Sequence, residues 1–270
     1  MEIIGYLASL LIGLALGLIG GGGSILTLPV LVYLFGVSPT LATAYSLFIV
    51  GTASLVGAYP KHREGLINYR TALVFGAPSI VAVFMTRKFL LPAIPKTLFE
   101  LGDLVVTKDL LLMVLFAILM LAASISMLRN GKPAQQTADQ PLQFNYPLIL
   151  IEGTVVGILT GLVGAGGGFL IIPALVILSK LPMKQAVGTS LLIIAAKSLI
   201  GFTGDLLTHE VMDWPLLLSV TVVAIAGIFV GNALSRKIDG GSLRKGFGWF
   251  VLVMGAYILI KELGLFPGIV

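Results

Sequence analysis

Long apolar runs alternate with short polar segments along the whole chain. Most runs contain 17–23 residues, which lets a helix cross an apolar layer of roughly 30 Å at about 1.5 Å per residue. The pattern predicts an all-α integral membrane protein. The ten runs fall at residues 3–19, 24–36, 41–58, 69–91, 109–128, 147–163, 168–179, 186–203, 214–235 and 243–263.

The chain contains the same apolar, glycine-rich phrase twice. Residues 17–32 read GLIGGGGSILTLPVLV and residues 161–176 read GLVGAGGGFLIIPALV. The offset of 144 residues continues without a gap, so that Gly57 aligns with Gly201. A membrane chain that repeats itself at half length, with a glycine break inside an apolar run of each half, is typical of transporters built from two repeats.

The segment after each break is short. Ile25–Phe35 and Phe169–Ser179 contain eleven residues each, or about 16 Å of helix, which is too little to cross a bilayer alone. We expect two short half-helices, and we leave open whether the first two segments of each half form a re-entrant hairpin or two full spans. The predicted units are a first transmembrane repeat, a cytoplasmic linker and a second transmembrane repeat, at residues 1–130, 131–146 and 147–270.

Five segments per half is an odd number, so the two halves are expected to be inverted in the membrane. Loop charges agree with inversion. Loop 59–68 holds Lys61 and Arg63, whereas its counterpart 204–213 holds three acids and no Lys or Arg; loop 36–40 is uncharged, whereas its counterpart 180–184 holds two Lys. Since Lys and Arg gather on the cytoplasmic side, we place loop 59–68 inside and loop 204–213 outside, together with both termini.

Loop 86–108 disagrees with this assignment, because it carries four basic residues and is placed outside. We expect a short surface helix within 92–108. The localisation expected from these patterns is the cell membrane, as a multi-pass protein of a bacterial or archaeal inner membrane. The four basic residues are Arg87, Lys88, Lys96 and Lys108.

Composition narrows the classes of function. Hydrophobic residues make up 57% of the chain and charged residues 11%, against about 25% charged in a soluble domain. The net charge of +5 is scattered and forms no stripe, so nucleic acid is not an expected partner. The chain has no Cys, its two His lie far apart in loops, and it contains no HExxH-type cluster. We therefore expect no enzyme activity, metal site or cofactor.

Glycine breaks at membrane depth leave backbone N–H and C=O groups that protein or water must satisfy. A helical run follows each break at once, so its first N–H groups would point into the break. A helix N-terminus carries roughly +0.5 of an elementary charge and binds anions. Two such ends, brought together by inverted halves, predict a site for a small anionic substrate. The glycines assigned to it are Gly20, Gly21, Gly22, Gly23, Gly164, Gly166, Gly167 and Gly168.

These glycines have two other interpretations. Close packing of helices through small residues is one, and it stays open. A nucleotide-binding glycine loop is the other. It is disfavoured because Phe169 takes the place of the third glycine of G-x-G-x-x-G, no strand precedes Gly164 and no Lys follows.

Polar side chains within the apolar runs complete the candidate site. Lys197 is the basic residue well inside a run, and Ala53 is its equivalent in the first repeat. Its charge would raise anion affinity, with snorkelling toward the membrane surface as the alternative. Ser24, expected to cap the first short helix, is the leading hydroxyl candidate. Further hydroxyl candidates are Ser46, Ser54, Thr189, Ser190 and Ser198, and the candidates for a coupling proton are Glu152 and Asp205.

The paired phrases GLIGGGGSILTLPVL and GLVGAGGGFLIIPAL resemble those of the sulfite exporter TauE/SafE family of membrane permeases. The resemblance covers nearly the whole chain and implies an internally duplicated, all-helical transporter of small anions. We expect a secondary transporter of sulfite or an organosulfonate that works by alternating access. A passive anion channel, a transporter of another small organic anion and a membrane subunit without a substrate stay open as alternatives. Membrane lipid is the expected surrounding, and homo-oligomerisation is left open.

Overall fold

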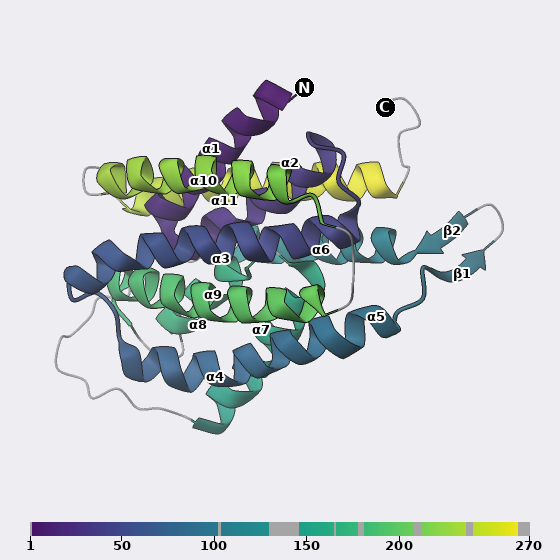
Figure 1. Ribbon diagram of the computed structural model, residues 1–270. Helices are drawn as coiled ribbons and strands as arrows, with labels where there is room; N and C mark the ends of the chain where they lie inside the picture. Colours follow the sequence, from purple (N-terminus) through teal and green to yellow (C-terminus); the bar gives the residue numbers. More distant parts are fainter. Residues whose placement is uncertain are drawn as a thin grey trace.

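The protein is a bundle of apolar helices, shown in Figure 1 as a computed structural model. The structure describes residues 2–101, 104–129, 146–164, 166–177, 181–207, 212–235 and 240–263. The helices of the first half are α1 (Glu2–Ile19), a 3₁₀ turn η1 (Gly20–Leu26), α2 (Thr27–Tyr33), α3 (Pro39–Arg63), α4 (Tyr69–Met85), a π-helical turn η2 (Thr86–Leu90), α5 (Leu91–Ala93) and α6 (Lys108–Arg129).

The second half repeats this order. Its helices are α7 (Tyr146–Val163), α8 (Gly168–Ile177), α9 (Met183–Leu206), α10 (Trp214–Ser235) and α11 (Gly240–Glu262). Each apolar run thus coincides with a helix, and the all-α prediction is confirmed. In both halves a short helix follows the glycine break, because positive φ values and close glycine contacts interrupt the longer run there.

Five helices in the described part of the chain are long and apolar enough to cross a membrane. They are Pro39–Arg63, Tyr69–Ala93, Lys108–Ser126, Met183–Leu206 and Trp214–Ser235. Shorter apolar helices cover Ile3–Ile19, Gly23–Tyr33 and Ile149–Val163. The predicted linker lies outside the described residues except for Tyr146. The sides assigned to the loops, and with them the inversion of the halves in the membrane, stay predictions.

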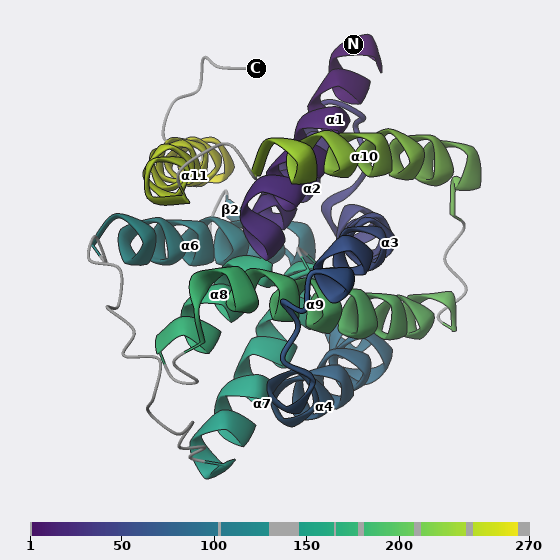
Figure 2. The ribbon, with the colours of Figure 1, turned by 90° about the vertical axis from the view of Figure 1, so that its left-hand side faces the viewer.

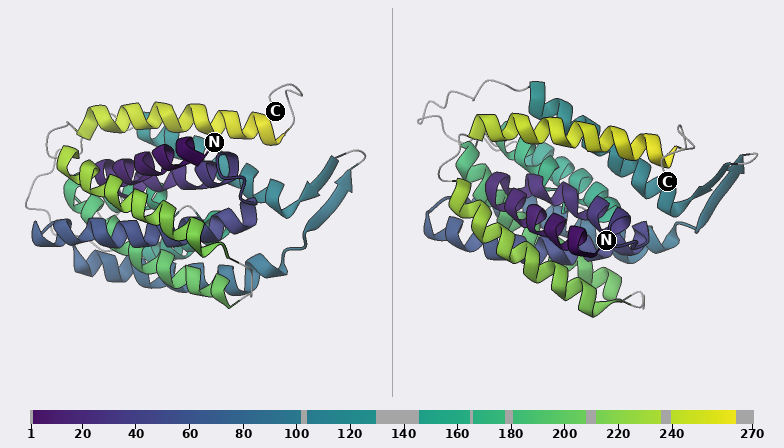
Figure 3. Two further views of the ribbon diagram at one scale, coloured as in Figure 1. Left: turned by 45° about the horizontal axis from the view of Figure 1, so that its top comes forward. Right: turned by 90° about the horizontal axis from the view of Figure 1, so that it is seen from above.

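One element differs from the sequence prediction. The loop at 92–108 does not form the surface helix that we expected. It forms an antiparallel hairpin of β1 (Thr97–Leu101) and β2 (Leu104–Thr107), which projects beyond the helices at one end of the molecule (Figures 1 and 3). The prediction was wrong because the stretch TLFELGDLVVT carries two Thr, two Val and one Phe among its eleven residues, and β-branched and aromatic residues favour strands.

Corresponding helices of the two halves pack against each other. The equivalent helices α3 and α9 lie side by side in the centre, between the pair α1 and α10 on one side and the pair α4 and α7 on the other (Figure 2). Each outer pair joins helices from different halves. The equivalent helices α6 and α11 form a further pair. The two halves therefore interlock, and neither buries its apolar surface without the other.

The central helices α3 and α9 run in opposite directions. The Phe48 and Phe202 rings are 5.1 Å apart at their centroids, whereas a Cβ on Gly188, near the start of α9, would lie 3.3 Å from the Cβ of Lys61, at the end of α3. The start of each helix is thus beside the end of the other. An antiparallel pair of equivalent helices is the arrangement that two inverted halves would require.

Candidate functional site

The two glycine breaks meet in space, although they are 144 residues apart. A Cβ built on Gly168 would lie 2.1 Å from the Cα of Gly21, and a Cβ built on Gly21 would lie 2.4 Å from the Cα of Gly168. Only glycine allows two backbones to approach this closely. The sequence prediction that the breaks form one shared feature of the fold agrees with this contact.

Each break also packs against the central helix of the other half, with matching contacts. A Cβ on Gly20 would lie 2.8 Å from Val187, and a Cβ on its equivalent, Gly164, would lie 2.2 Å from the carbonyl oxygen of Thr43. Val187 and Thr43 are themselves equivalent under the 144-residue offset. The crossing of the breaks is therefore held between α3 and α9.

The two breaks differ in their backbone. The second contains three glycines with φ between +59° and +73°, namely Gly164, Gly166 and Gly167, and α8 then begins at Gly168. The first has a positive φ at Gly20, and η1 continues from there into α2. We expected an α-helix to begin directly after each break. The second half has one, α8, whereas the 3₁₀ turn η1 takes its place in the first half.

Ser24 does not cap the first short helix. It lies inside η1, its hydroxyl donates to the carbonyl oxygen of Gly21 at 2.7 Å, and the residue before α2 is Leu26, which makes no side-chain cap. The prediction was wrong because α2 begins at Thr27, two residues later than the expected start at Ile25. Ser24 instead stabilises the turn that brings Gly21 to the crossing.

Lys197 reaches into the second break. Its side chain is completely buried, its Nζ donates to the hydroxyl of Thr160 at 3.1 Å, and a Cβ on Gly167 would lie 2.9 Å from Nζ. Among the described residues, no carboxylate forms an ion pair with Lys197. The ammonium group therefore lies beside the N-terminus of α8, and the two positive features meet without an acidic counterpart from the described chain.

The candidate hydroxyls surround the crossing on α3 and α9. Val50 and its equivalent Ile194 lie within 3.4 Å of a Cβ built on Gly166. Val50 has a serine four residues before it and another four residues after it, and so does Ile194, which puts all four serines on the helix faces that carry these two residues. The four serines are buried. The Oγ atoms of three have no hydrogen-bond partner in the described structure, whereas the fourth donates to a backbone carbonyl. The three are Ser46, Ser54 and Ser198, and the fourth is Ser190, which donates to Val187 at 2.9 Å.

The remaining candidates lie farther from the crossing. The hydroxyl oxygen of Thr189 accepts the backbone N–H of Asn68 at 2.9 Å, so it fixes the start of α4 to α9. Glu152, on α7, has a buried Oε2 with no hydrogen-bond partner in the described structure. Asp205 is engaged by Arg87, with Nη2 of the arginine 2.7 Å from Oδ2.

Arg87 is not a loop charge, as the sequence prediction had it, whereas the membrane side predicted for it is not tested by the structure. Arg87 lies in η2, directly after α4, and is 1% exposed. Its Nε donates to Oδ2 of Asp205 at 2.8 Å, and its Nη1 donates to the hydroxyl of Thr43 at 2.9 Å and to the carbonyl oxygen of Gly161 at 3.1 Å. No local sequence signal identifies these contacts, because Arg87 and Asp205 are 118 residues apart.

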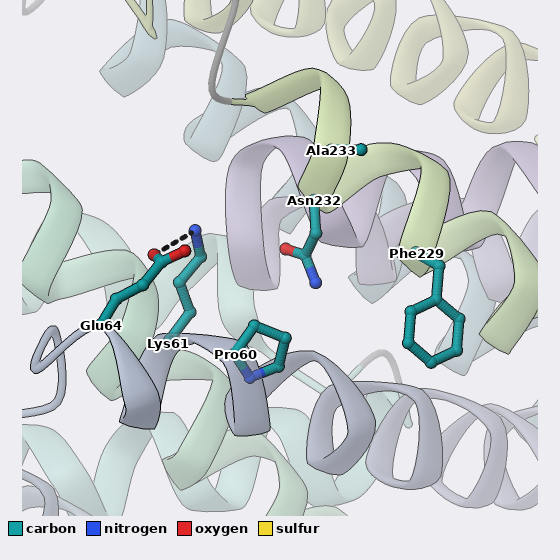
Figure 4. Close-up of a pocket in the computed structure, with 6 residues that line it drawn as sticks. All are labelled: Pro60, Lys61, Glu64, Phe229, Asn232 and Ala233. Carbon is teal, nitrogen blue, oxygen red and sulfur yellow. Dashed lines mark hydrogen bonds and ion pairs between the residues drawn. The ribbon is translucent and has the colours of Figure 1, made fainter.

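Two clefts lie at opposite ends of the α3–α9 pair. One, of about 200 Å³, lies between the ends of α3 and α10 and is lined by Pro60, Lys61, Glu64, Phe229, Asn232 and Ala233. Figure 4 shows Asn232 pointing from α10 toward α3, where Lys61 pairs with Glu64 at 3.4 Å. The other, of about 400 Å³, has Arg87 and Asp205 in its lining. No group of three or more His, Cys, Asp or Glu that could hold a metal occurs among the described residues.

The chain matches one known protein family over nearly its whole length. The model of the family described as "Sulfite exporter TauE/SafE" matches residues 5–258. A protein of Xylella fastidiosa (strain 9a5c) named "Probable membrane transporter protein" is 31% identical over 93% of this chain and 92% of its own length. "Probable membrane transporter protein YdhB" of Bacillus subtilis (strain 168) is 30% identical over 94% of this chain and 98% of its own. No solved structure matches the chain.

Proposed function

Because the chain belongs to the sulfite exporter TauE/SafE family and is a membrane transporter, we propose that it is a secondary transporter of small anions. Sulfite or an organosulfonate is the proposed substrate. The proposed binding site is the crossing of the two glycine breaks, with Lys197 as its charged residue. The family name supports the sulfur oxyanion, and the geometry of the crossing supports the negative charge.

One observation carries this proposal: the position of the Lys197 ammonium group. Nζ is buried next to Gly167, at the positive end of α8. It forms no ion pair with any carboxylate of the described residues. A buried charge costs several kcal/mol unless an opposite charge or strong hydrogen bonds compensate it. An anion bound between Lys197 and the start of α8 would supply that compensation.

Transport through this site requires the crossing to open. Gly21 and Gly168 are in backbone contact, so no solute fits between them in this conformation. In the proposed alternating-access cycle, the α1–α10 pair and the α4–α7 pair rock about the α3–α9 pair and separate the breaks toward one side at a time. The exchange of helices between the halves supports this, because α1 would move with α10 and α4 with α7.

Two carboxylates are proposed to carry a coupling proton. Asp205 holds Arg87 at the end of α9, so its protonation would weaken the contact between α9 and η2. Glu152 has a buried oxygen that lacks a hydrogen-bond partner in the described structure. Either group changes the charge inside the bundle when it binds a proton, which is what coupling of anion movement to a proton gradient requires.

The test is anion binding by the purified, detergent-solubilised protein. Thermal stability should rise with sulfite, thiosulfate or sulfonates, because a ligand that binds the folded state stabilises it by mass action. Carboxylates of similar size and charge are compared in the same measurement, to show whether stabilisation requires a sulfur oxyanion or only a negative charge. A protein that no sulfur oxyanion stabilises, at any concentration that leaves it monodisperse, would refute the substrate assignment.

A passive anion channel is the second candidate. The completely closed crossing favours a carrier, because a carrier needs an occluded state between its two open states. Flux in proteoliposomes separates the two. A carrier coupled to protons accumulates anion above its own electrochemical equilibrium when a proton gradient is imposed, whereas a channel only dissipates the anion gradient.

A further inference from the structure

The recess beside Arg87 is a separate, basic cavity at one end of the bundle. The β1–β2 hairpin, seen in Figure 1, projects from the same end. The recess measures about 400 Å³, within the usual range of about 300–1,000 Å³ for small-molecule sites. Arg87 is buried in its wall, and the side chains of Lys96 and Lys108 line it from the loop before β1 and the start of α6. The other lining residues are Thr40, Ala44, Leu91, Pro92, Ile94, Pro95, Asp205 and Met212.

We propose that this recess is a second anion-binding site, in which an oxyanion replaces the carboxylate of Asp205 on the guanidinium of Arg87. The proposal deepens the proposed function, on which it rests, since the site would receive the anion before or after it occupies the crossing. The ligand class is a small sulfonate or sulfur oxyanion with at least two oxygens that accept in parallel.

The contact between Arg87 and Asp205 leaves the guanidinium suited to such an exchange. Nε and Nη2 both meet the same carboxylate oxygen, Oδ2, at 2.8 Å and 2.7 Å. Nη2 does not reach hydrogen-bond geometry with any described acceptor, although it is buried. A fork-to-fork pair, with one oxygen on each nitrogen, is the stronger arrangement. A sulfonate offers two oxygens at this spacing and would complete it.

The charges that face the recess favour an anion. Three cationic side chains line it, from η2, the loop before β1 and α6, whereas Asp205 of α9 is the acid in its lining. Asp109, next to Lys108 on α6, is engaged elsewhere: Oδ1 accepts the backbone N–H of Thr40 at 3.0 Å and the hydroxyl of the same residue. Asp205 lines the same recess as Lys96 and Lys108, so a carboxylate displaced from Arg87 would remain in a basic environment.

The recess connects to the crossing through two consecutive residues. Nη1 of Arg87 donates to the carbonyl oxygen of Gly161, and the hydroxyl of the preceding residue, Thr160, accepts from Nζ of Lys197. Arg87 also binds Thr43, whose carbonyl oxygen lies against Gly164 in the break. The cationic groups thus follow one another from the mouth of the recess, through Arg87, to Lys197 at the crossing.

The other half lacks this arrangement at the equivalent place. Gly161 packs against the carbonyl oxygen of Val83 and its equivalent Gly17 packs against that of Ile228, so Arg87, four residues after Val83, corresponds to Asn232, four residues after Ile228. By the 144-residue offset, Asp205 corresponds to Lys61. The cleft in Figure 4 is therefore the counterpart of the recess.

That counterpart holds an amide and a lysine instead of a buried ion pair. The Oδ1 and Nδ2 atoms of Asn232 are buried and have no hydrogen-bond partner in the described structure, and Lys61 pairs with Glu64 on its own helix. The proposed site therefore exists at only one end of the α3–α9 pair among the described residues, where an anion can replace Asp205 on Arg87. The cleft at the other end has no buried ion pair of this kind.

The experiment measures methanesulfonate binding by isothermal titration to full-length protein in non-ionic detergent. Methanesulfonate is chosen because it is a chemically inert sulfonate. All variants carry Lys197→Ala, so that the crossing no longer contributes its charge. In this background Asp205→Asn removes the competing carboxylate and should tighten binding by about tenfold, as expected for the loss of one charged competitor. Adding Arg87→Gln to Asp205→Asn should abolish the binding.

The Arg87→Gln, Asp205→Asn pair replaces both charged groups by neutral amides and leaves no buried charge uncompensated, which protects the fold. Lys88→Gln is the matched control, because it removes the same charge at the adjacent, exposed residue and should leave affinity unchanged. Equal affinity with and without Arg87 would overturn the proposal. Arg87-dependent binding of an anionic phospholipid in nanodiscs, without any binding of methanesulfonate, would overturn it too, since the ligand would then be a lipid headgroup.

The outcome is independent of the crossing. If Lys197→Ala alone leaves transport intact, the proposed site at the breaks fails, whereas the recess stands as long as binding follows Arg87. If binding ignores Arg87 but transport needs Lys197, the recess fails and the proposed function stands.

Discussion

Gly21 and Gly168 are in backbone contact, so close that a methyl group on Gly168 would lie 2.1 Å from the Cα of Gly21. The contact joins the 3₁₀ turn of the first half to the first residue of α8 in the second. Because neither residue has room for a side chain, the two breaks close the centre of the molecule against each other. Movement of the α1–α10 pair away from the α4–α7 pair would have to change this contact.

Substitution of Gly168 by Ala should therefore destabilise the protein by about 1–3 kcal/mol, the usual cost of overpacking a core. Gly76→Ala is the matched control within α4, because its Cβ would meet Ile193 at an ordinary 3.7 Å. In a helix, that change should be neutral or stabilising by up to about 1 kcal/mol. Thermal unfolding in one detergent compares them, and a Gly168→Ala protein as stable as Gly76→Ala would show that the contact is not close-packed.

Lys197→Met should have effects of opposite sign on stability and on binding. Without anion, the variant should be more stable by about 1–3 kcal/mol, because a buried charge is replaced by an apolar chain of similar length. Its affinity for sulfite should fall by about tenfold or more, which corresponds to about 1.4 kcal/mol. Lys197→Arg should retain part of the affinity. A variant that loses stability and keeps its affinity would assign Lys197 to the fold alone.

The ion pair between Arg87 and Asp205 should show strong coupling. Arg87→Ala should cost about 3–5 kcal/mol, since it leaves the carboxylate of a 7%-exposed residue without its guanidinium. The double variant Arg87→Gln, Asp205→Asn should cost clearly less than the sum of its two single changes. A double-mutant cycle in thermal or chemical unfolding measures this, and additive losses would mean that the two side chains do not stabilise each other.

The orientation of the halves can be tested by single-cysteine labelling, which is clean because the chain has no native Cys. Glu64 and Leu207 are exposed at equivalent ends of α3 and α9. If the repeats are inverted, Glu64→Cys should react with an impermeant reagent from the cytoplasmic side and Leu207→Cys from the outside. Reaction of both from the same side would contradict the inverted arrangement.

The helices and the positions of the two glycine breaks could be predicted from the sequence, because they depend on local hydrophobic pattern and on the repeat. Apolar runs of sufficient length defined the helices, and the duplicated glycine phrase located the interruptions at Gly20 and Gly164, where the backbone has positive φ. The position of Lys197 inside an apolar run made it a candidate for the anion site, although its equivalent in the first repeat is Ala53. The sequence did not predict the 3₁₀ turn of η1, because 3₁₀ and α-helical backbones have similar residue preferences over a few positions.

Contacts between distant side chains could not be predicted in this way. The sequence treated Arg87 as a loop charge, because charge counting uses position along the chain and contains no information on packing. Only the fold brings η2 to the end of α9 and buries the guanidinium against Asp205. Thr160 was missed for a similar reason: a threonine in an apolar helix usually bonds to its own backbone, and its hydroxyl does so here while also accepting from Lys197.

The most direct test of an anion site at the crossing is radiolabelled sulfite transport in proteoliposomes, measured for Lys197→Met and Lys88→Met side by side. Both changes remove one lysine charge, one buried at the break and the other exposed at the end of the bundle. With equal amounts of folded protein in the vesicles, Lys88→Met should transport at the wild-type rate and Lys197→Met should lose most of its transport. Transport at the wild-type rate by Lys197→Met would contradict the assignment of the anion site to the crossing.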